Sequence, residues 1–405
     1  SPTGRMSMKR SGMRMGTTKR PDGLWGWMMR IKLSEVCDIQ YGFPFDSAKF
    51  SESEGTPLIR IRDVKRGYTE TYTVEDVPDE YIIAEGEILI GMDGEFNVAK
   101  WGKTPAALNQ RVCHIIPKDG IDSDYIFFAL PSKLKEIENK TAFVTVKHLS
   151  AKALNAIEIN VPSIDKQHTI AEILRHMVSI IETRKQQLSE LDILIKARFV
   201  EMFGEPESNT KRWAEKKMSD LCTVSSSKRI LQSEQCEEGI PFLRVSDLVR
   251  RMDTGELSAD LHIPEARYAD LCKQGQVPAA GDILVTSRGT LGRCYIWDAE
   301  DKFYFQDGMI SWLSNYSNEV TPLYLSYLFS MPGFKKQIDR LQAGSTVAYL
   351  SIAMIKQLVV MLPDVELQEQ FAAFVAQVDK SKIAIQKALD EAQILFDSLM
   401  QEFFG

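Results

Sequence analysis

The sequence has little of what most metalloproteins and membrane proteins need. Its 405 residues include five histidines and six cysteines, at positions 37, 113, 222, 236, 272 and 294. No two cysteines form a C-x-x-C pair and the histidines lack zinc-ligand spacing, which argues against a structural metal site. No run approaches the roughly 20 apolar residues of a membrane span, and no secretory signal with an apolar core is present. Scattered, unpaired cysteines are typical of reduced thiols, so we expect a cytoplasmic protein.

Catalytic motifs are also missing. The sequence has no G-x-x-x-x-G-K-[ST] loop for a nucleoside triphosphate and no Asn-Pro-Pro or Asp-Pro-Pro stretch of an amino-methyltransferase. No Ser-His-Asp or Cys-His pairing is readable from spacing. We therefore expect a protein that is not an enzyme by itself.

The charge balance is acidic, with 49 basic and 56 acidic residues and a net charge of -7. Affinity for duplex DNA comes largely from neutralising phosphates, so a DNA-binding role requires localised positive charge or help from partner subunits. Residues 1–28 differ from the rest, with six basic residues, one acid and no hydrophobic period. We interpret residues 1–30 as a disordered leader, added residues or a mis-set start, with a basic arm that touches DNA as the alternative. Folded sequence is expected from about Ile31.

An internal repeat organises the remainder of the chain. Motifs recur in the same order in both halves, with glycine, proline, arginine and aspartate conserved in place and apolar positions conserved in kind. The matching segments are 55–64 (GTPLIRIRDV) and 239–248 (GIPFLRVSDL), 86–90 (GEILI) and 281–285 (GDILV), 145–150 (TVKHLS) and 346–351 (TVAYLS), and 203–204 and 404–405 (FG).

The spacing between matching motifs separates each half into two parts. The offset grows from 184 (239 − 55) to 195 (281 − 86) and then to 201 (346 − 145), after which it stays constant. Insertions therefore lie in the front of each half, whereas the last sixty or so residues align without a gap. Short apolar runs bounded by Gly, Pro or Asp predict strands in the fronts, including 58–64 and 242–248. Residues 125–130 and 324–329 predict short buried helices.

The backs predict two long helices. Neither Pro nor Gly occurs from Asp165 to Phe203, or from 365 to Phe404. Apolar residues at alternating steps of four and three form a seam that is interrupted by Arg184, Arg198 and Lys382, which predicts a coiled coil. Connectivity makes the two helices antiparallel if they pair along their length. The seam residues are Ile170, Leu174, Met177, Ile181, Leu188, Leu191, Ile195, Phe371, Val375, Val378, Ile385, Leu389, Ala392, Phe396, Leu399 and Phe403.

These patterns predict an α+β fold. We expect two mixed α/β recognition domains, separated by a long antiparallel two-helix coiled coil and related by a pseudo-twofold internal repeat. Two similar but not identical heads at a fixed spacing suit a bipartite, asymmetric target on double-stranded DNA. The expected boundaries are 1–30 for the leader, 31–163 for the first domain, 164–204 for the first helix, 205–364 for the second domain and 365–405 for the second helix.

From Ile31 to Gly405 the chain resembles the specificity subunit of type I restriction-modification systems. The resemblance is carried by residues 33–36 (LSEV) with 42–45 (GFPF), by 281–292 (GDILVTSRGTLG), and by Thr346, Leu350-Ser351, Pro363 and Gln368. It implies two target recognition domains, one for each half of a split site. It also implies that the helices carry two modification (methyltransferase) subunits, joined by restriction/translocase subunits. Cofactors are then expected in those partners (S-adenosylmethionine, ATP and Mg), and none in this chain.

The chain departs from the family pattern in places, and two other functions stay open. Residues 92–95 (MDGE) stand where the second half has 287–290 (SRGT), so the first domain should use this loop differently. A type IIB-like specificity subunit, whose partner fuses methylation and cleavage, fits equally well. A coiled-coil scaffold with protein-binding heads is the alternative of another class. A basic strip on both heads would favour DNA.

Base reading needs polar and charged side chains on loops that reach a groove. For Arg60 and Arg244 a structural ion pair with a nearby aspartate is the alternative, and for the pairs 228–229 and 250–251 it is a solvated surface. Residues 147–148 occupy the same place as 348–349, which favours a functional loop there. The DNA-binding candidates are Lys49, Arg60, Arg62, Asn109, Gln110, Arg111, Lys147 and His148 in the first domain, and Lys228, Arg229, Arg244, Arg250, Arg251, Ser287, Arg288 and Thr346 in the second.

Overall fold

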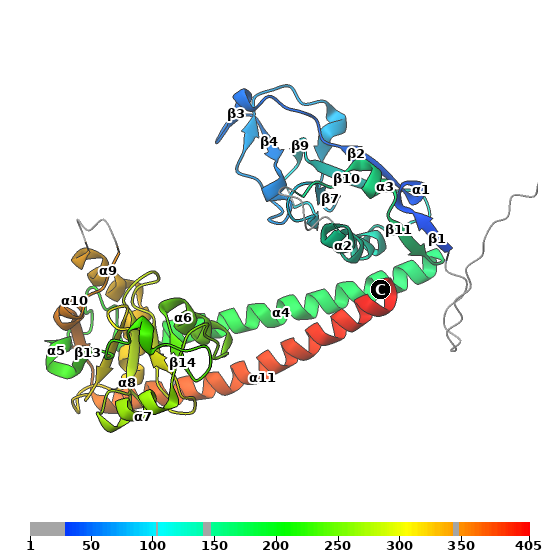
Figure 1. The fold of residues 1–405 in the computed structure, drawn as a ribbon. Coiled ribbons are helices and arrows are strands. Elements are labelled where there is room, and N and C mark those ends of the chain that lie inside the picture. Colours follow the sequence, from blue (N-terminus) through cyan, green and yellow to red (C-terminus); the bar gives the residue numbers. More distant parts are fainter. Residues whose placement is uncertain (1–28, 103, 141–146, 343–347) are drawn as a thin grey trace, which may run out of the picture. The chain divides into compact units, whose positions relative to one another are not determined.

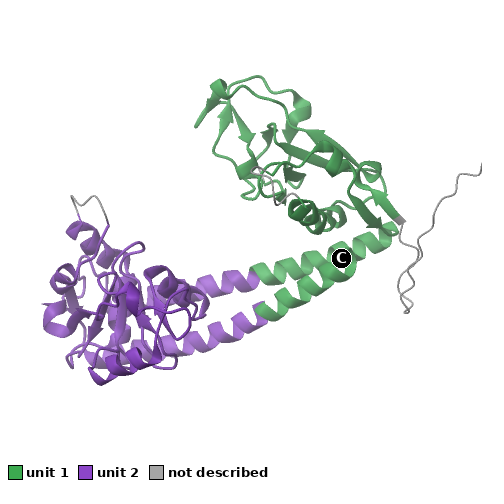
Figure 2. Ribbon diagram, in the orientation of Figure 1, with its two compact units in different colours: residues 1–182, 390–405 green, residues 183–389 purple. Residues whose placement is uncertain are grey.

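The computed structural model describes residues 29–102, 104–140, 147–342 and 348–405 (Figure 1). The chain divides into two compact units, which Figure 2 colours separately. Unit 1 comprises residues 1–182 and 390–405, and unit 2 comprises residues 183–389. Among the described helices, none is both long and apolar enough to cross a membrane.

Unit 1 begins with a strand that closes its base. Strand β1 (Met29–Lys32) pairs antiparallel with β11 (Glu158–Val161), and α1 (Leu33–Val36) follows at once. Residues 29 and 30 therefore belong to the fold, although the sequence placed them in the leader. The error arose because only four residues pair here, too few to show an alternating pattern.

Besides the β1-β11 pair, two larger sheets build the first domain. The hydrogen-bonded order of one is β2-β10-β7-β8, and that of the other is β3-β5-β4-β9-β6. Residues such as Ile90, Cys113 and Tyr125 form a core between the first sheet and helix α2. The elements are β2 (Cys37–Tyr41), η1 (Ser47–Lys49), β3 (Phe50–Ser51), β4 (Thr56–Ile59), η2 (Ile61–Asp63), β5 (Tyr72–Thr73), η3 (Asp79–Tyr81), β6 (Ile82–Ile83), β7 (Ile88–Gly91), β8 (Val98–Lys100), β9 (Ala106–Leu108), β10 (Val112–Pro117), α2 (Ser123–Lys140) and α3 (Ala151–Asn155).

The second domain, in unit 2, repeats this plan. The orders β12-β20 and β13-β19-β16-β17 reproduce β1-β11 and β2-β10-β7-β8, and a third sheet has the order β15-β14-β18. In the second copy, helices α6 and α7 lie where the offset between the halves grows. Its elements are β12 (Ala214–Lys217), α5 (Met218–Leu221), β13 (Thr223–Ser226), η4 (Gln232–Glu234), β14 (Ile240–Leu243), α6 (Val245–Thr254), β15 (His262–Ile263), α7 (Glu265–Lys273), β16 (Ile283–Thr286), β17 (Cys294–Ile296), β18 (Tyr304–Phe305), β19 (Ile310–Ser314), α8 (Pro322–Ser330), α9 (Pro332–Leu341), α10 (Ile352–Gln357) and β20 (Val359–Leu362).

The two long helices, α4 (Ile164–Phe203) and α11 (Val365–Phe404), are confirmed almost to the residue. In unit 1 the beginning of α4 shares a core with the end of α11, where Leu174 and Phe404 are both buried. In unit 2 the end of α4 packs on the beginning of α11 through Phe199 and Phe371, whose ring centroids lie 5.5 Å apart. Within each unit, therefore, the helices run antiparallel with the predicted seam between them.

A buried glutamine fixes each domain to the helix that follows it. The Gln167 Oε1 accepts from the Asp122 N–H at 2.9 Å and its Nε2 donates to the Pro162 carbonyl at 2.9 Å. The Gln368 Oε1 accepts from the Thr321 N–H at 2.8 Å, and its Nε2 donates to two carbonyls at 2.9 Å. Each glutamine satisfies backbone N–H and C=O groups that would otherwise be buried without a hydrogen-bond partner. Each therefore holds the first turn of its long helix against the preceding domain.

Two predicted strands are shorter than expected. Strands were predicted over 58–64 and 242–248, but β4 ends at Ile59 and β14 at Leu243. The chain then turns into η2 and α6, because the Asp63 and Asp247 carboxylates accept from the backbone N–H three residues earlier, at 2.9 and 3.0 Å. An aspartate at this spacing caps a helical turn, which competes with continued strand.

Candidate nucleic-acid interface

Two loops of the first domain meet and bring three polar side chains together. The loop after β7 pairs with the segment before α3 through a bridge between Asp93 and His148. The His148 Nδ1 lies 2.6 Å from Asp93 Oδ1, and the Arg111 Nε lies 3.6 Å from Asp93 Oδ2. We call Asp93, Arg111 and His148 the first loop cluster. Its side chains are 28%, 57% and 45% exposed, so they combine fixed geometry with access from solvent.

The second domain builds the same backbone with different side chains. A bridge joins Arg288 to Tyr349, and the Ser287 N–H donates to the Met309 carbonyl as the Met92 N–H donates to that of Arg111. We call Arg288, Met309 and Tyr349 the second loop cluster. Arg288 is exposed, and its guanidinium contacts the Met309 sulfur at 3.8 Å.

Arg111 has an unusual backbone. Its φ is +74°, in the left-handed region that L side chains rarely adopt, whereas in the second domain the positive φ, +69°, falls on Gly308, the residue before Met309. Residues held in such conformations cost of order 1–3 kcal/mol and gather at functional sites. The first domain therefore has this strained conformation on an arginine, whereas the second has it on a neighbouring glycine.

The other first-domain candidates fall into two groups. Arg60 and Arg62 line an open hollow of about 800 Å³, in which Arg60 lies over the Phe50 ring at 6.0 Å and Arg62 donates to Thr71 Oγ1. Lys49 and Gln110 are exposed.

Two predictions for the first domain fit a structural role better. Asn109 is buried, and its side-chain Oδ1 accepts from the Gln110 N–H. The Lys147 ammonium is committed to Glu138 at 2.8 Å. The structure thus points away from Asn109 as a base reader and shows Lys147 in an ion pair.

In the second domain the arginines are mostly paired with acids. Arg244 contacts Asp247 and Asp260, and Arg250 shares Asp247 at 2.9 Å, so the structural alternative for Arg244 is present. Arg251, with a side chain 14% exposed, pairs with Asp301.

The remaining second-domain candidates differ in access. Lys228 and Arg229 are exposed, and the Lys228 Nζ donates to Gln274 at 3.0 Å. Ser287 is buried and its hydroxyl lies 2.8 Å from that of Ser311, which removes it from direct contact with DNA in this conformation. Thr346 lies outside the described residues.

The site list drawn from the sequence omitted Asp93 and Tyr349. Both are visible in the repeat, since Asp93 aligns with Arg288 and Tyr349 with His148. What the sequence could not show is that the two loops touch. That contact makes the aligned positions one surface in each domain.

A polar pair at the strands of each domain also differs between the two domains. The His114 Nε2 is 3.8 Å from Glu87 Oε1, whereas the Trp312 Nε1 donates to Asp282 at 2.9 Å in the second domain. Burial lowers the pKa of His114, and Glu87 opposes that shift. In the described part of the chain, no group of three or more His, Cys, Asp or Glu side chains could hold a metal ion.

Comparison with known families then decides the classification. The family model described as "Type I restriction modification DNA specificity domain" matches residues 26–192 and 210–394, which is one copy in each half. The chain belongs to this family. The match also confirms the internal repeat and begins inside the stretch interpreted as a leader.

Individual relatives agree over nearly the whole chain. The EcoBI specificity subunit of a type I restriction enzyme from Escherichia coli is 28% identical over 93% of this chain and 84% of its own length. The MjaIX specificity subunit from Methanocaldococcus jannaschii is 25% identical over 80% of this chain and 78% of its own.

Solved structures support the same α+β fold. The type I S subunit from M. genitalium has a TM-score of 0.54 at 16% identity, over 93% of this chain and 96% of that one. A chain from a study of complex assembly and conformational transition in the type I R-M system has a TM-score of 0.55 at 15% identity, over 95% of this chain and 99% of that one.

Proposed function

We propose that this chain is the DNA sequence-recognition subunit of a type I restriction-modification enzyme. Each domain reads one half of a bipartite, asymmetric site on double-stranded DNA. The long helices dock two modification (methyltransferase) subunits and, through the assembly, restriction/translocase subunits. Family membership supports this role, and so does the divergence of the two loop clusters.

One observation carries the reading of two different half-sites. The loops after β7 and β16 each form a bridge to the equivalent position before a short helix, His148 in one domain and Tyr349 in the other, yet they present Asp93 in the first domain and Arg288 in the second. A position that serves only stability has no reason to carry an acidic side chain in one domain and a basic side chain in the other. A position that faces different nucleobases in the two half-sites does have such a reason.

The chemistry of each cluster predicts its preference. Arg288 offers a guanidinium fork, which matches the O6 and N7 acceptors of guanine in the major groove. In the first cluster the Asp93 carboxylate holds Arg111 and His148. Asp93 then either orients Arg111 toward a guanine or itself accepts from a cytosine amino group.

The partners account for what this chain lacks. The net charge of -7 is unfavourable for phosphate binding, so the methyltransferase subunits should share the phosphate contacts. We propose that catalysis and its cofactors (S-adenosylmethionine, ATP and Mg) belong to those subunits, that this chain is not itself an enzyme, and that the complex acts in the cytoplasm.

The test is a genome-wide map of methylated bases in cells that carry the native chain, Arg288→Ala or Asp93→Asn. Each variant should relax or abolish one half of a gapped motif and leave the other half intact, because a lost bidentate contact costs about 1–3 kcal/mol of discrimination. Lys273→Ala is the matched control, since Lys273 forms only an exposed pair with Asp270. If the gene can be deleted without changing the map in a system that methylates, the chain does not read DNA. If both half-sites survive both substitutions, the loop clusters do not.

A further inference from the structure

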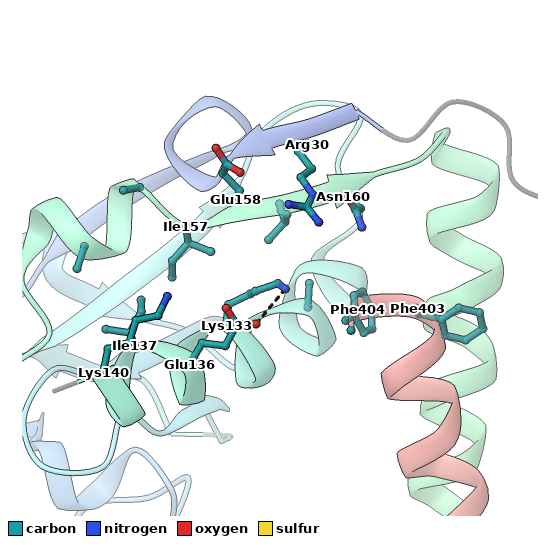
Figure 3. Close-up of a pocket in the computed structure, with 15 residues that line it drawn as sticks. Arg30, Lys133, Glu136, Ile137, Lys140, Ile157, Glu158, Asn160, Phe403 and Phe404 are labelled. Carbon is teal, nitrogen blue, oxygen red and sulfur yellow. Dashed lines mark hydrogen bonds and ion pairs between the residues drawn. The ribbon is translucent and has the colours of Figure 1, made fainter. Parts of the chain in front are cut away.

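Unit 1 contains an open hollow beside the end of α11. Its volume is about 610 Å³, and it lies among α2, α3, β11 and residues 403–405 (Figure 3). Its floor is apolar, with Ile137, Ile157 and Phe404. Basic side chains come from two sides: in Figure 3, Arg30 extends from β1 and Lys133 from α2, where Lys133 pairs with Glu136 at 3.3 Å.

In unit 2 the equivalent place is filled by the chain itself. Past the end of α4, Pro206 is buried, and the Glu207 backbone crosses α9 so closely that a Cβ on Gly333 would lie 2.8 Å from its nitrogen. The Glu207 carboxylate pairs with Lys336 at 2.5 Å and with Arg340 at 2.6 Å. The segment 205–213 thus covers this surface before β12 begins.

The registers of the two units make the comparison definite. β1 pairs with β11 as β12 pairs with β20, so Met29 corresponds to Ala214, a difference of 185. On the helices, buried Leu134 and Glu138 correspond to buried Phe334 and Ile338, a difference of 200. Lys140 therefore stands where Arg340 stands, and the hollow is the counterpart of the surface that Glu207 covers.

The sequence before β1 matches the sequence before β12 at the same difference. Residues 21–28 read PDGLWGWM, and residues 206–213 read PESNTKRW. Pro21 aligns with Pro206 and the acid Asp22 with Glu207, without a gap. Trp27 is one residue from the position of Trp213, whose indole N–H donates to the Phe203 carbonyl at 2.9 Å.

We infer that the hollow is a docking site for residues 21–28 of the same chain. Asp22 then meets Lys140 and Arg30 at a rim where Lys133 is already paired with Glu136 and where Glu158 also lies, and the tryptophans cover the apolar floor next to Phe404. Lys133 replaces Gly333, so the surface of α2 does not admit a backbone as close as that of Glu207 on α9. The inference concerns this chain alone and does not depend on DNA reading.

Disulfide trapping in the full chain tests the contact. Asp22→Cys is combined with Lys140→Cys, or with Lys135→Cys as the control, because Lys135 is on the same helix but does not line the hollow. After mild oxidation, peptide mapping should find the 22–140 bond formed at least tenfold faster than the 22–135 bond. Equal rates, or no bond in either variant, would overturn the inference.

A charge exchange gives a second, independent readout. Asp22→Lys and Lys140→Asp should each lower the thermal midpoint of the full chain, because each places like charges together. The double variant should recover most of the loss. Additive losses in the double variant would also overturn the inference, and would leave the hollow to a partner subunit.

Discussion

Replacing Gln368 with alanine should destabilise unit 2 by about 2–4 kcal/mol. The side chain is 1% exposed and satisfies three backbone groups, the Thr321 N–H and the carbonyls of Glu319 and Pro363. Leaving one buried polar group without a partner costs about 1–3 kcal/mol. Alanine removes all three bonds, but water can replace those nearest the surface, so the total falls short of the sum.

The assay is urea denaturation of the full chain, followed by tryptophan fluorescence and circular dichroism. Gln377→Ala is the control, because Gln377 is an exposed glutamine on the same helix and its loss should cost no more than about 0.5 kcal/mol. Gln167→Ala is the matched change in unit 1 and should shift the transition of that unit instead. If Gln368→Ala shifts unfolding no more than Gln377→Ala does, the reasoning about buried amide bonds here is wrong.

Three further predictions concern the cores and can be checked by equilibrium unfolding. Burial raises the pKa of the Cys113 thiol to about 12, from an ordinary value of 9.0. The contribution of the buried thiol to stability is therefore complete below pH 9 and is lost as pH rises toward 12. Cys113→Ala should reduce the slope with which the free energy of unfolding falls above pH 9 by up to about 1.4 kcal/mol per pH unit. Substituting exposed Cys272 should leave that slope unchanged. Phe199→Ala should cost about 3–5 kcal/mol, because its fully buried ring contacts three other aromatic rings, and a cost under 1 kcal/mol would refute that packing. Gly42→Ala should destabilise unit 1 by about 1–3 kcal/mol, since the new Cβ would lie 2.0 Å from the backbone carbonyl oxygen of Asn109. An unchanged unfolding midpoint would contradict this prediction.

The long helices were predictable because their signals are local and repeated. An apolar residue every three or four positions, with no Pro or Gly between, leaves little choice of structure, and α4 and α11 begin at the predicted residue and end one residue before the predicted one. By contrast, α2 extends ten residues beyond the predicted end at Leu130. The prediction stopped there because Pro131, which lies inside the helix, would ordinarily mark a helix end.

The loops were harder, because a sequence does not show which side of a loop faces the core. Ser287 and Arg288 are neighbours, yet one is buried against Ser311 and the other is exposed. The bridge from Arg288 to Tyr349, sixty-one positions away (349 − 288), and the hydrogen bond from the Ser287 N–H to the Met309 carbonyl hold the loop in that orientation. Polarity alone could therefore nominate both residues but could not separate the exposed side chain from the buried one.

The composition of unit 1 has a consequence for synthesis. Unit 2 is one continuous stretch, residues 183–389, whereas unit 1 needs residues 390–405, including buried Phe404, to complete its core. At roughly 5–20 residues per second, a ribosome takes roughly 10–40 s to make the 207 residues (389 − 182) that separate the two parts of unit 1. Unit 1, which is translated first, therefore keeps part of its apolar core exposed until residues 390–405 are made, whereas unit 2 can complete its core earlier. The order in which the two units complete their folding is thus the reverse of the order in which their synthesis begins.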